Sequence, residues 1–312
     1  MAATLLSISS CSSSDKLITN ILIIVQPWLT SSSNSTLPAK LYNLLIIDHE
    51  ATERAELLGL KHNHLPAPFK ILALHGVADS VELHLLHRHF TLEEGEAIVH
   101  RTLEISGSED APSISVDVAK AVSCPESVQP FLVPLLWMAS PNGSLVAYEY
   151  GLRQSANASQ QSTTASISSE RWNSFAQEFS ACVHRAGIAD LVSLKDKSCI
   201  NGGEYVVPSM RVLFRIPTQA VNLQPGSEML ESGWDFDRVG DSDPTFPECT
   251  DGHVTKTERT SAGIVARDHV TEEDGINAFN GEEVSVLYTN VMWDAAKSEG
   301  LWALGQMVDA AT

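Results

Sequence analysis

Apolar and polar residues alternate through much of the chain between residues 69 and 150. Successive side chains of a β-strand point to opposite faces, so a period of two is typical of strands. The runs are short and follow one another closely, which predicts a sheet. The predicted strands are Phe69–Leu74, Val81–Leu92, Ala97–Ile105, Ser113–Val122, Phe131–Ala139 and Ser144–Tyr150.

Two tight turns are predicted within this sheet. Glu94-Gly95 separates Leu92 from Ala97, and Pro141-Asn142-Gly143 separates Trp137 from Val146. Glycine and asparagine adopt the positive φ angles that hairpin turns require. Both segments therefore predict hairpins, and hairpins imply antiparallel pairing.

The pattern changes on either side of this region. Residues 41–60 have a partly helical pattern, and the polar residues 153–169 have too few apolar side chains to form a core. Glu170–Ala186 places Trp172, Phe175 and Phe179 at helical spacing, with Ser169 as a candidate N-cap and Gly187 as a stop. The remaining predicted elements are strands at Tyr205–Ile216, His253–Val265 and Glu283–Met292 and a helix at Asp294–Ala310.

This order of elements predicts an α+β fold, with a mixed, mainly antiparallel sheet and a few packing helices. We expect a poorly ordered segment over residues 1–40 and a mainly β lobe over 41–152. A polar linker or insertion at 153–169 then leads to an α+β lobe over 170–312, packed on the first lobe.

Charge and composition narrow the classes of partner. The 312 residues include 39 acidic and 20 basic ones, for a net charge of −19. This charge argues against nucleic acid as a partner, because phosphate binding needs clustered Lys and Arg. Among apolar segments, Leu17–Leu29 is too short to span a membrane and lacks a basic flank, so we expect a cytoplasmic or nuclear protein rather than a secreted one. The five cysteines are scattered, without the spacing of a disulfide framework or a zinc site.

A histidine group between residues 81 and 100 is the strongest chemical signal, because imidazole is a common ligand of transition metals. If Glu94-Gly95 forms a two-residue turn, His89 faces His100 across the hairpin and His87 lies diagonally beside them. Glu94 or Glu96 would then serve as a fourth ligand or a base. In the alternative interpretation, the histidines are dispersed along a partly exposed hairpin. The His-X-His spacing also resembles the first metal motif of cupins, although a second cupin motif is absent.

Other groups give weaker signals. His75-Gly76 resembles the oxyanion loop of α/β-hydrolases, but no Gly-X-Ser-X-Gly elbow follows it. Cys182 and His184 point in different directions on a helix and do not form a catalytic pair. His253 belongs to a mixed polar set that is a candidate to line a cleft together with the histidines of residues 81–100. His253 is also a candidate catalytic residue. An acidic loop has the composition that hard cations favour without EF-hand spacing; its carboxylates are Asp235, Asp237, Asp241 and Asp243.

Two segments carry a resemblance to other proteins. Glu82 to Phe90 with Glu94-Gly95-Glu96, and Gly187 to Leu191, resemble uncharacterised predicted proteins of filamentous fungi over about residues 60–210. That resemblance implies a fungal cytosolic or nuclear protein and no mechanism. Our first hypothesis is a binding or regulatory module for a small molecule or protein. The alternatives are an enzyme of fungal secondary metabolism that uses a divalent transition metal, and a cofactor-free enzyme with an apolar cleft between the lobes.

Overall fold

The computed structural model describes residues 37, 39–105, 114–125, 129–152, 162–207, 211–217, 227–235, 248–260 and 263–269. All of them belong to one compact unit that starts at Thr36. The helices are α2 (Ala39–Tyr42), α3 (Asp48–Leu58), α4 (Leu60–Asn63), α5 (Pro66–Leu74) and α6 (Ser169–Arg185), with short 3₁₀ helices at Gln129–Phe131 and Thr163–Ser166. The strands are β1 (Val81–Leu85), β2 (Glu96–Ile105), β3 (Ile114–Ser123), β4 (Leu132–Ala139), β5 (Leu145–Leu152), β6 (Val192–Asp196), β7 (Gly202–Val207), β8 (Val212–Pro217), β9 (Ser227–Asp235), β10 (Glu248–Thr260) and β11 (Gly263–His269).

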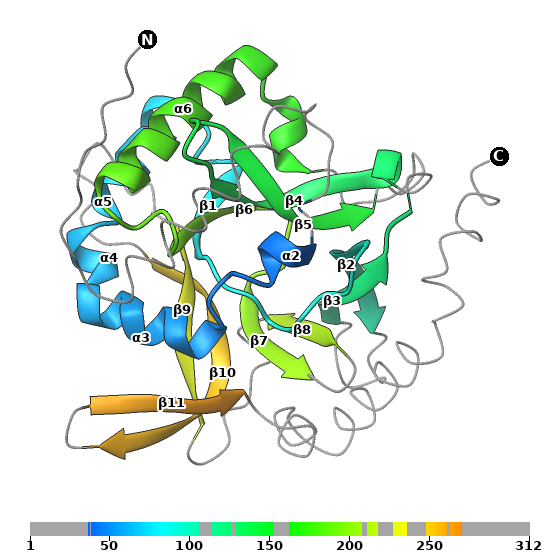
Figure 1. The fold of residues 1–312 in the computed structure, drawn as a ribbon, viewed down its shortest axis with the longest axis vertical. Helices are drawn as coiled ribbons and strands as arrows, with labels where there is room; N and C mark the ends of the chain where they lie inside the picture. The colour runs from blue at the N-terminus through cyan, green and yellow to red at the C-terminus, as the bar shows by residue number, and fades with distance from the viewer. Residues whose placement is uncertain are drawn as a thin grey trace, which may run out of the picture. The chain divides into compact units, whose positions relative to one another are not determined.

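The strands form a closed barrel (Figure 1). Around the ring, β10 is followed by β7, β8, β3, β2, β5, β4, β6, β1 and β9, and β9 pairs again with β10. The pairs β2–β5 and β7–β10 are parallel, and the other pairs are antiparallel. Strand β11 pairs with the end of β10 outside the ring.

This closed ten-strand mixed barrel corrects the predicted α+β fold with packing helices. The prediction treated the sheet as open, because alternation along a strand does not say which strands are neighbours. Strands from before and after residues 153–169 lie side by side in the ring, since β4 pairs with β6 and β3 pairs with β8.

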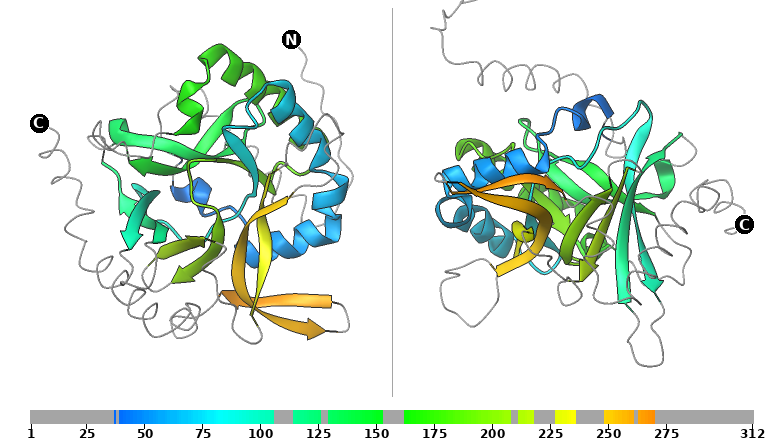
Figure 2. Two further views of the ribbon diagram at one scale, coloured as in Figure 1. Left: turned by 180° about the vertical axis from the view of Figure 1, so that it is seen from behind. Right: turned by 90° about the horizontal axis from the view of Figure 1, so that it is seen from below.

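The main apolar core lies between the barrel wall and the helices. Figures 1 and 2 show α3, α5 and α6 on one side of the barrel. Leu83 of β1, Trp137 of β4 and Leu194 of β6 point outward into this core and meet Phe175 and Phe179 of α6. Their strand neighbours Glu82, His84 and Lys195 point the other way and are fully buried. The inner face of these strands is therefore the charged one.

Helix α5 corrects a second prediction. Residues 69–74 are helical rather than extended, and the helix begins at Pro66. Prolines in the first turn of a helix cost little, because the N–H groups there have no partner within the helix. Leu65, Phe69 and Leu72 are buried at helical spacing, whereas Leu74 is 74% exposed.

The predicted hairpin at Glu94-Gly95 is also wrong. Strand β1 ends at Leu85 and pairs with β6 and β9, while β2 pairs with β3 and β5. Gly95 does adopt a positive φ of 81°, but its turn leads from an irregular loop into β2. His89 and His100 are therefore not cross-strand neighbours.

Several local predictions are confirmed. β2, β3, β4 and β5 match their predicted runs, and Asn142-Gly143 connects β4 to β5 as an antiparallel hairpin. Helix α6 is capped by the Ser168 side chain, one residue before the predicted cap, and Gly187 follows it with a φ of 71°. Of residues 1–40, which were predicted to be poorly ordered, the structure describes Leu37 and the start of α2 at Ala39. The predictions for residues 283–292 and 294–310 lie outside the described residues. Among the helices in the described part of the chain, none is long and apolar enough to cross a membrane.

A core substitution tests the packing of α6. Phe179 is fully buried and stacks near Phe175, with 5.6 Å between ring centroids. We expect Phe179→Ala to lower the free energy of unfolding by about 3–5 kcal/mol, because it removes a buried ring and leaves a cavity. Urea unfolding followed by circular dichroism measures this effect. A loss below about 1 kcal/mol would show that α6 is not packed as described.

Candidate metal site inside the barrel

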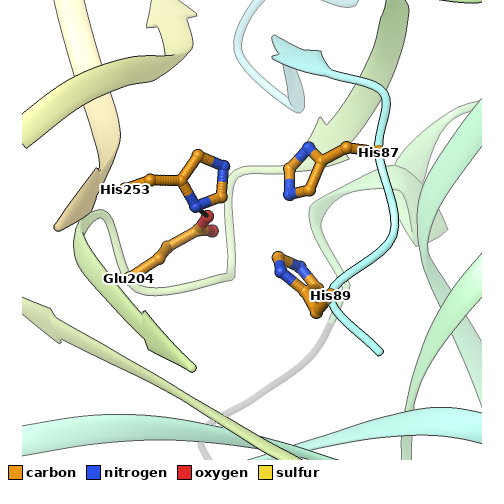
Figure 3. Close-up of side chains that lie close together, drawn as sticks. All are labelled: His87, His89, Glu204 and His253. Carbon is orange, nitrogen blue, oxygen red and sulfur yellow. Dashed lines mark ion pairs between the residues drawn. The ribbon is translucent and has the colours of Figure 1, made fainter. Parts of the chain in front are cut away.

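Four buried side chains from three separate parts of the chain meet inside the barrel (Figure 3). His87 and His89 belong to the loop after β1, Glu204 lies on β7, and His253 lies on β10. One donor atom from each residue lies within 4.8 Å of the others. The spacing is that of groups able to share one metal ion.

The loop with His87 and His89 is held in place by the segment around α2, which lies at one opening of the barrel (Figure 1). The backbone N–H of His89 donates to the Tyr42 hydroxyl at 3.2 Å. Arg88 donates to the carbonyl of Ile46 from its backbone at 2.9 Å and to that of Leu45 from Nε at 3.0 Å. These bonds leave the two imidazoles pointing inward.

Strand pairing brings the other two residues together. Glu204 and His253 are direct partners in the parallel β7–β10 pair. Arg215 of β8 is the partner of Glu204, and Asp117 of β3 is the partner of Arg215. Side chains directly opposite one another on neighbouring strands are within reach of contact. Four strands in a row thus carry an inward polar group at the same level.

The tautomer of His87 is set by a hydrogen bond to the backbone of Leu85. Its Nδ1–H donates to the carbonyl of Leu85 at 2.7 Å, so Nε2 carries the lone pair. Nε2 is buried without a hydrogen-bond partner and faces the other three side chains (Figure 3). Burial and the neighbouring His253 hold the pKa of His87 well below its usual value. The ring is therefore neutral at physiological pH, the form that binds metals.

Carboxylates face the other two imidazoles. Nδ1 of His253 lies 3.1 Å from Oε2 of Glu204, and Nε2 of His89 lies 3.7 Å from Oε1 of Glu149. Burial opposes ionisation of Glu204, but Arg215 and His253 keep its pKa well below the usual value. Each of the three histidines thus has one nitrogen close to an oxygen acceptor.

Carboxylates outnumber lysine and arginine side chains in the described part of the barrel interior. Lys195 contacts Glu82 at 2.9 Å and also pairs with Asp251, and Arg215 contacts Glu204 and Asp117. The buried carboxylates outnumber the cations formed by Lys195, Arg215 and protonated His100; they belong to Glu82, Asp117, Glu149, Glu204 and Asp251. A buried carboxylate is costly without a cationic partner, so a bound cation would stabilise this interior.

The remaining residues predicted for the site lie elsewhere. His100 is buried between Asp117 and Glu149, outside the four-residue cluster. Glu94 is exposed, and Glu96 binds Arg211 at 2.6 and 2.8 Å. The sequence-based arrangement of His87, His89 and His100 depended on the 94–95 hairpin, which does not form. Glu204 was not singled out from the sequence, because a lone Glu in an apolar strand carries no motif.

The weaker candidates are engaged in other contacts. His75 ends α5 and binds Glu178 at 2.7 Å, on a helix rather than after the strand that an oxyanion loop requires. Cys182 packs partly against the apolar core, and Asp235 pairs with Lys197. The other three carboxylates of the acidic loop, at Asp237, Asp241 and Asp243, lie outside the described residues.

Three imidazoles and a carboxylate form a donor set that suits first-row transition metals and zinc better than magnesium or calcium.

No protein-family model, curated protein or solved structure matches the chain.

The pH dependence of stability reports on His100. Burial opposes protonation of His100, but Asp117 and Glu149 raise its pKa to about 9. A raised pKa in the folded state stabilises the protein fully below the unfolded value of about 6.5, and this contribution is lost as pH rises towards 9. We expect the metal-free protein to lose unfolding free energy between pH 6.5 and 9, and His100→Gln to lose less. Urea unfolding at several pH values checks this; equal slopes for the two proteins would contradict it.

Proposed function

We propose that this protein binds a divalent transition-metal ion inside its barrel through His87, His89 and His253, with Glu204 beside them. The observation that carries the proposal is the buried Nε2 of His87, which has a lone pair, lacks a hydrogen-bond partner and faces the cluster. Such an atom is costly to bury unless it binds something. The excess of carboxylates around it favours a cation as that ligand.

Metal content tests the proposal directly. The untagged protein is purified without chelators, and its metal is quantified by mass spectrometry beside His87→Ala, His253→Ala and His184→Ala. His184 is an exposed histidine on α6, so its replacement is a matched control. We expect about one ion per chain in the wild type and in His184→Ala, and little in the other two variants. A folded wild type that neither retains Zn²⁺, Ni²⁺ or Co²⁺ nor binds them after incubation would refute the site.

A metal-dependent enzyme is a second candidate function. Glu204 already accepts hydrogen bonds from Arg215 and contacts His253, so three imidazoles can hold the ion while a fourth position stays open. Catalytic zinc sites have this arrangement, whereas structural sites use four protein ligands. Azide added to the Co²⁺ form distinguishes the two. A change in the visible absorption indicates an open position and favours the enzyme, and an unchanged spectrum favours a metal-binding module.

A further inference from the structure

We infer that His100 is a positioning residue for the metal ligands, an inference that depends on the proposed metal site. His100 does not touch the four-residue cluster. It joins two buried carboxylates that connect, on either side, to His89 and His253. Together these groups form a ring of charged side chains inside the barrel.

Each contact in the ring joins groups that are almost completely buried. From Glu149 the ring leads in one direction to Nε2 of His89 at 3.7 Å. In the other direction the successive contacts are Glu149 to His100 at 2.7 Å, His100 to Asp117 at 2.7 Å, Asp117 to Arg215 at 3.2 Å, Arg215 to Glu204 at 2.9 Å, and Glu204 to His253 at 3.1 Å. His89 and His253 both belong to the four-residue cluster, which closes the ring of charged side chains.

His100 occupies the position in this ring where a cation is needed. Nδ1 meets a carboxylate oxygen of Asp117 and Nε2 meets one of Glu149, so both nitrogens donate a proton. A doubly protonated imidazole is a cation, and it donates a charge-assisted hydrogen bond to each of the two buried carboxylates. A neutral side chain at this position would leave Glu149 without its charged partner.

Glu149 in turn acts on His89. Its Oε2 is held by His100, while Oε1 has no hydrogen-bond partner and faces Nε2 of His89. A carboxylate fixed there favours a proton on Nε2 of His89, so the lone pair of the neutral imidazole lies on Nδ1. Outer carboxylates of this kind orient a ligating histidine and increase its basicity, and their loss typically weakens metal binding about 10–100-fold.

Two substitutions test this role, with a third as control. In His100→Gln the amide has one donor nitrogen, so it can serve only one of the two carboxylates. Glu149→Gln keeps the shape of the side chain and removes its charge. Tyr148 is next to Glu149 in the sequence, and its hydroxyl donates a buried hydrogen bond to Ser193 at 3.0 Å. Tyr148→Phe removes this bond and leaves the ring of charged side chains intact.

The measurement is a Co²⁺ titration of each full-length protein, with chelator competition for the dissociation constant and visible absorption for the ligand field. We expect His100→Gln and Glu149→Gln to raise the dissociation constant about 10–100-fold and to shift the absorption bands. Tyr148→Phe should change neither, even if it unfolds more easily. The band shift separates positioning from a loss of stability alone.

The outcomes distinguish this inference from the proposed function. A wild type that binds no Co²⁺ would refute the site and the role of His100 with it. If His100→Gln and Glu149→Gln both bind Co²⁺ with the wild-type affinity and an unchanged spectrum, the role of His100 is refuted and the proposed metal site is not. If His100→Gln does not fold, the better-matched Glu149→Gln decides the result.

Discussion

Replacing Arg215 with methionine will lower the free energy of unfolding by about 3–5 kcal/mol. Arg215 is fully buried and binds Glu204 through two nitrogens and Asp117 through a third, at 3.2 Å. Methionine fills much of the same space, so the main loss is charge rather than volume. Two carboxylates would remain in the barrel without the cation that compensates them, and breaking a buried ion pair from one side is strongly destabilising.

Arg211→Met is the matched control for this prediction. Arg211 precedes β8 and binds Glu96, but its side chain is 35% exposed. Partly exposed pairs of this kind contribute about 1 kcal/mol or less. Urea unfolding of both metal-free variants, followed by circular dichroism, gives the comparison. Equal small losses in the two would show that the inner network does not depend on Arg215.

Adding Zn²⁺ or Ni²⁺ will stabilise the wild-type protein against unfolding but will not stabilise His87→Ala. A ligand that binds only the folded state stabilises it by about 4 kcal/mol at a concentration near one thousand times its dissociation constant. The proposed ligands come from the β1 loop, β7 and β10, which are brought together only by folding. We expect Zn²⁺ or Ni²⁺ to raise the unfolding free energy by an amount of this order, and EDTA to reverse the effect.

His87→Ala removes the unpartnered Nε2 and should abolish this gain. His184→Ala should keep it, because His184 is exposed on α6. A thermal unfolding series over metal concentration makes the comparison. A metal-dependent increase of the same size in His87→Ala would place the ion elsewhere in the protein.

Local patterns identified many elements but not their partners. The period of two found β2, β3, β4 and β5, and helical spacing found α6, because these signals come from residues close in sequence. The same period suggested a strand at residues 69–74, where prolines in the first turn and contacts with α6 favour a helix. Residues 69–74 are apolar except for Lys70, and so short an apolar run does not distinguish the two structures.

Local sequence patterns did not predict the charged barrel interior either. Alternation in β1 shows that Glu82 and His84 share one face and Leu83 the other, but either face can be the inner one. Helices packed outside the barrel take the apolar face, and polar partners such as Lys195 come from strands far away in the chain.

The sequence by itself determined an acidic chain with a strand-rich centre, one strong amphipathic helix and a histidine-rich segment at residues 84–89. Tertiary structure alone decided that the strands close into a barrel, that His253 and Glu204 meet His87 and His89, and that His100 lies outside this cluster. The physical reason is that these facts depend on strand pairing between segments that are far apart in the sequence; β1 and β6, for example, are more than 100 residues apart. Register is set by packing and hydrogen bonding of the whole sheet, and no short stretch of sequence contains it.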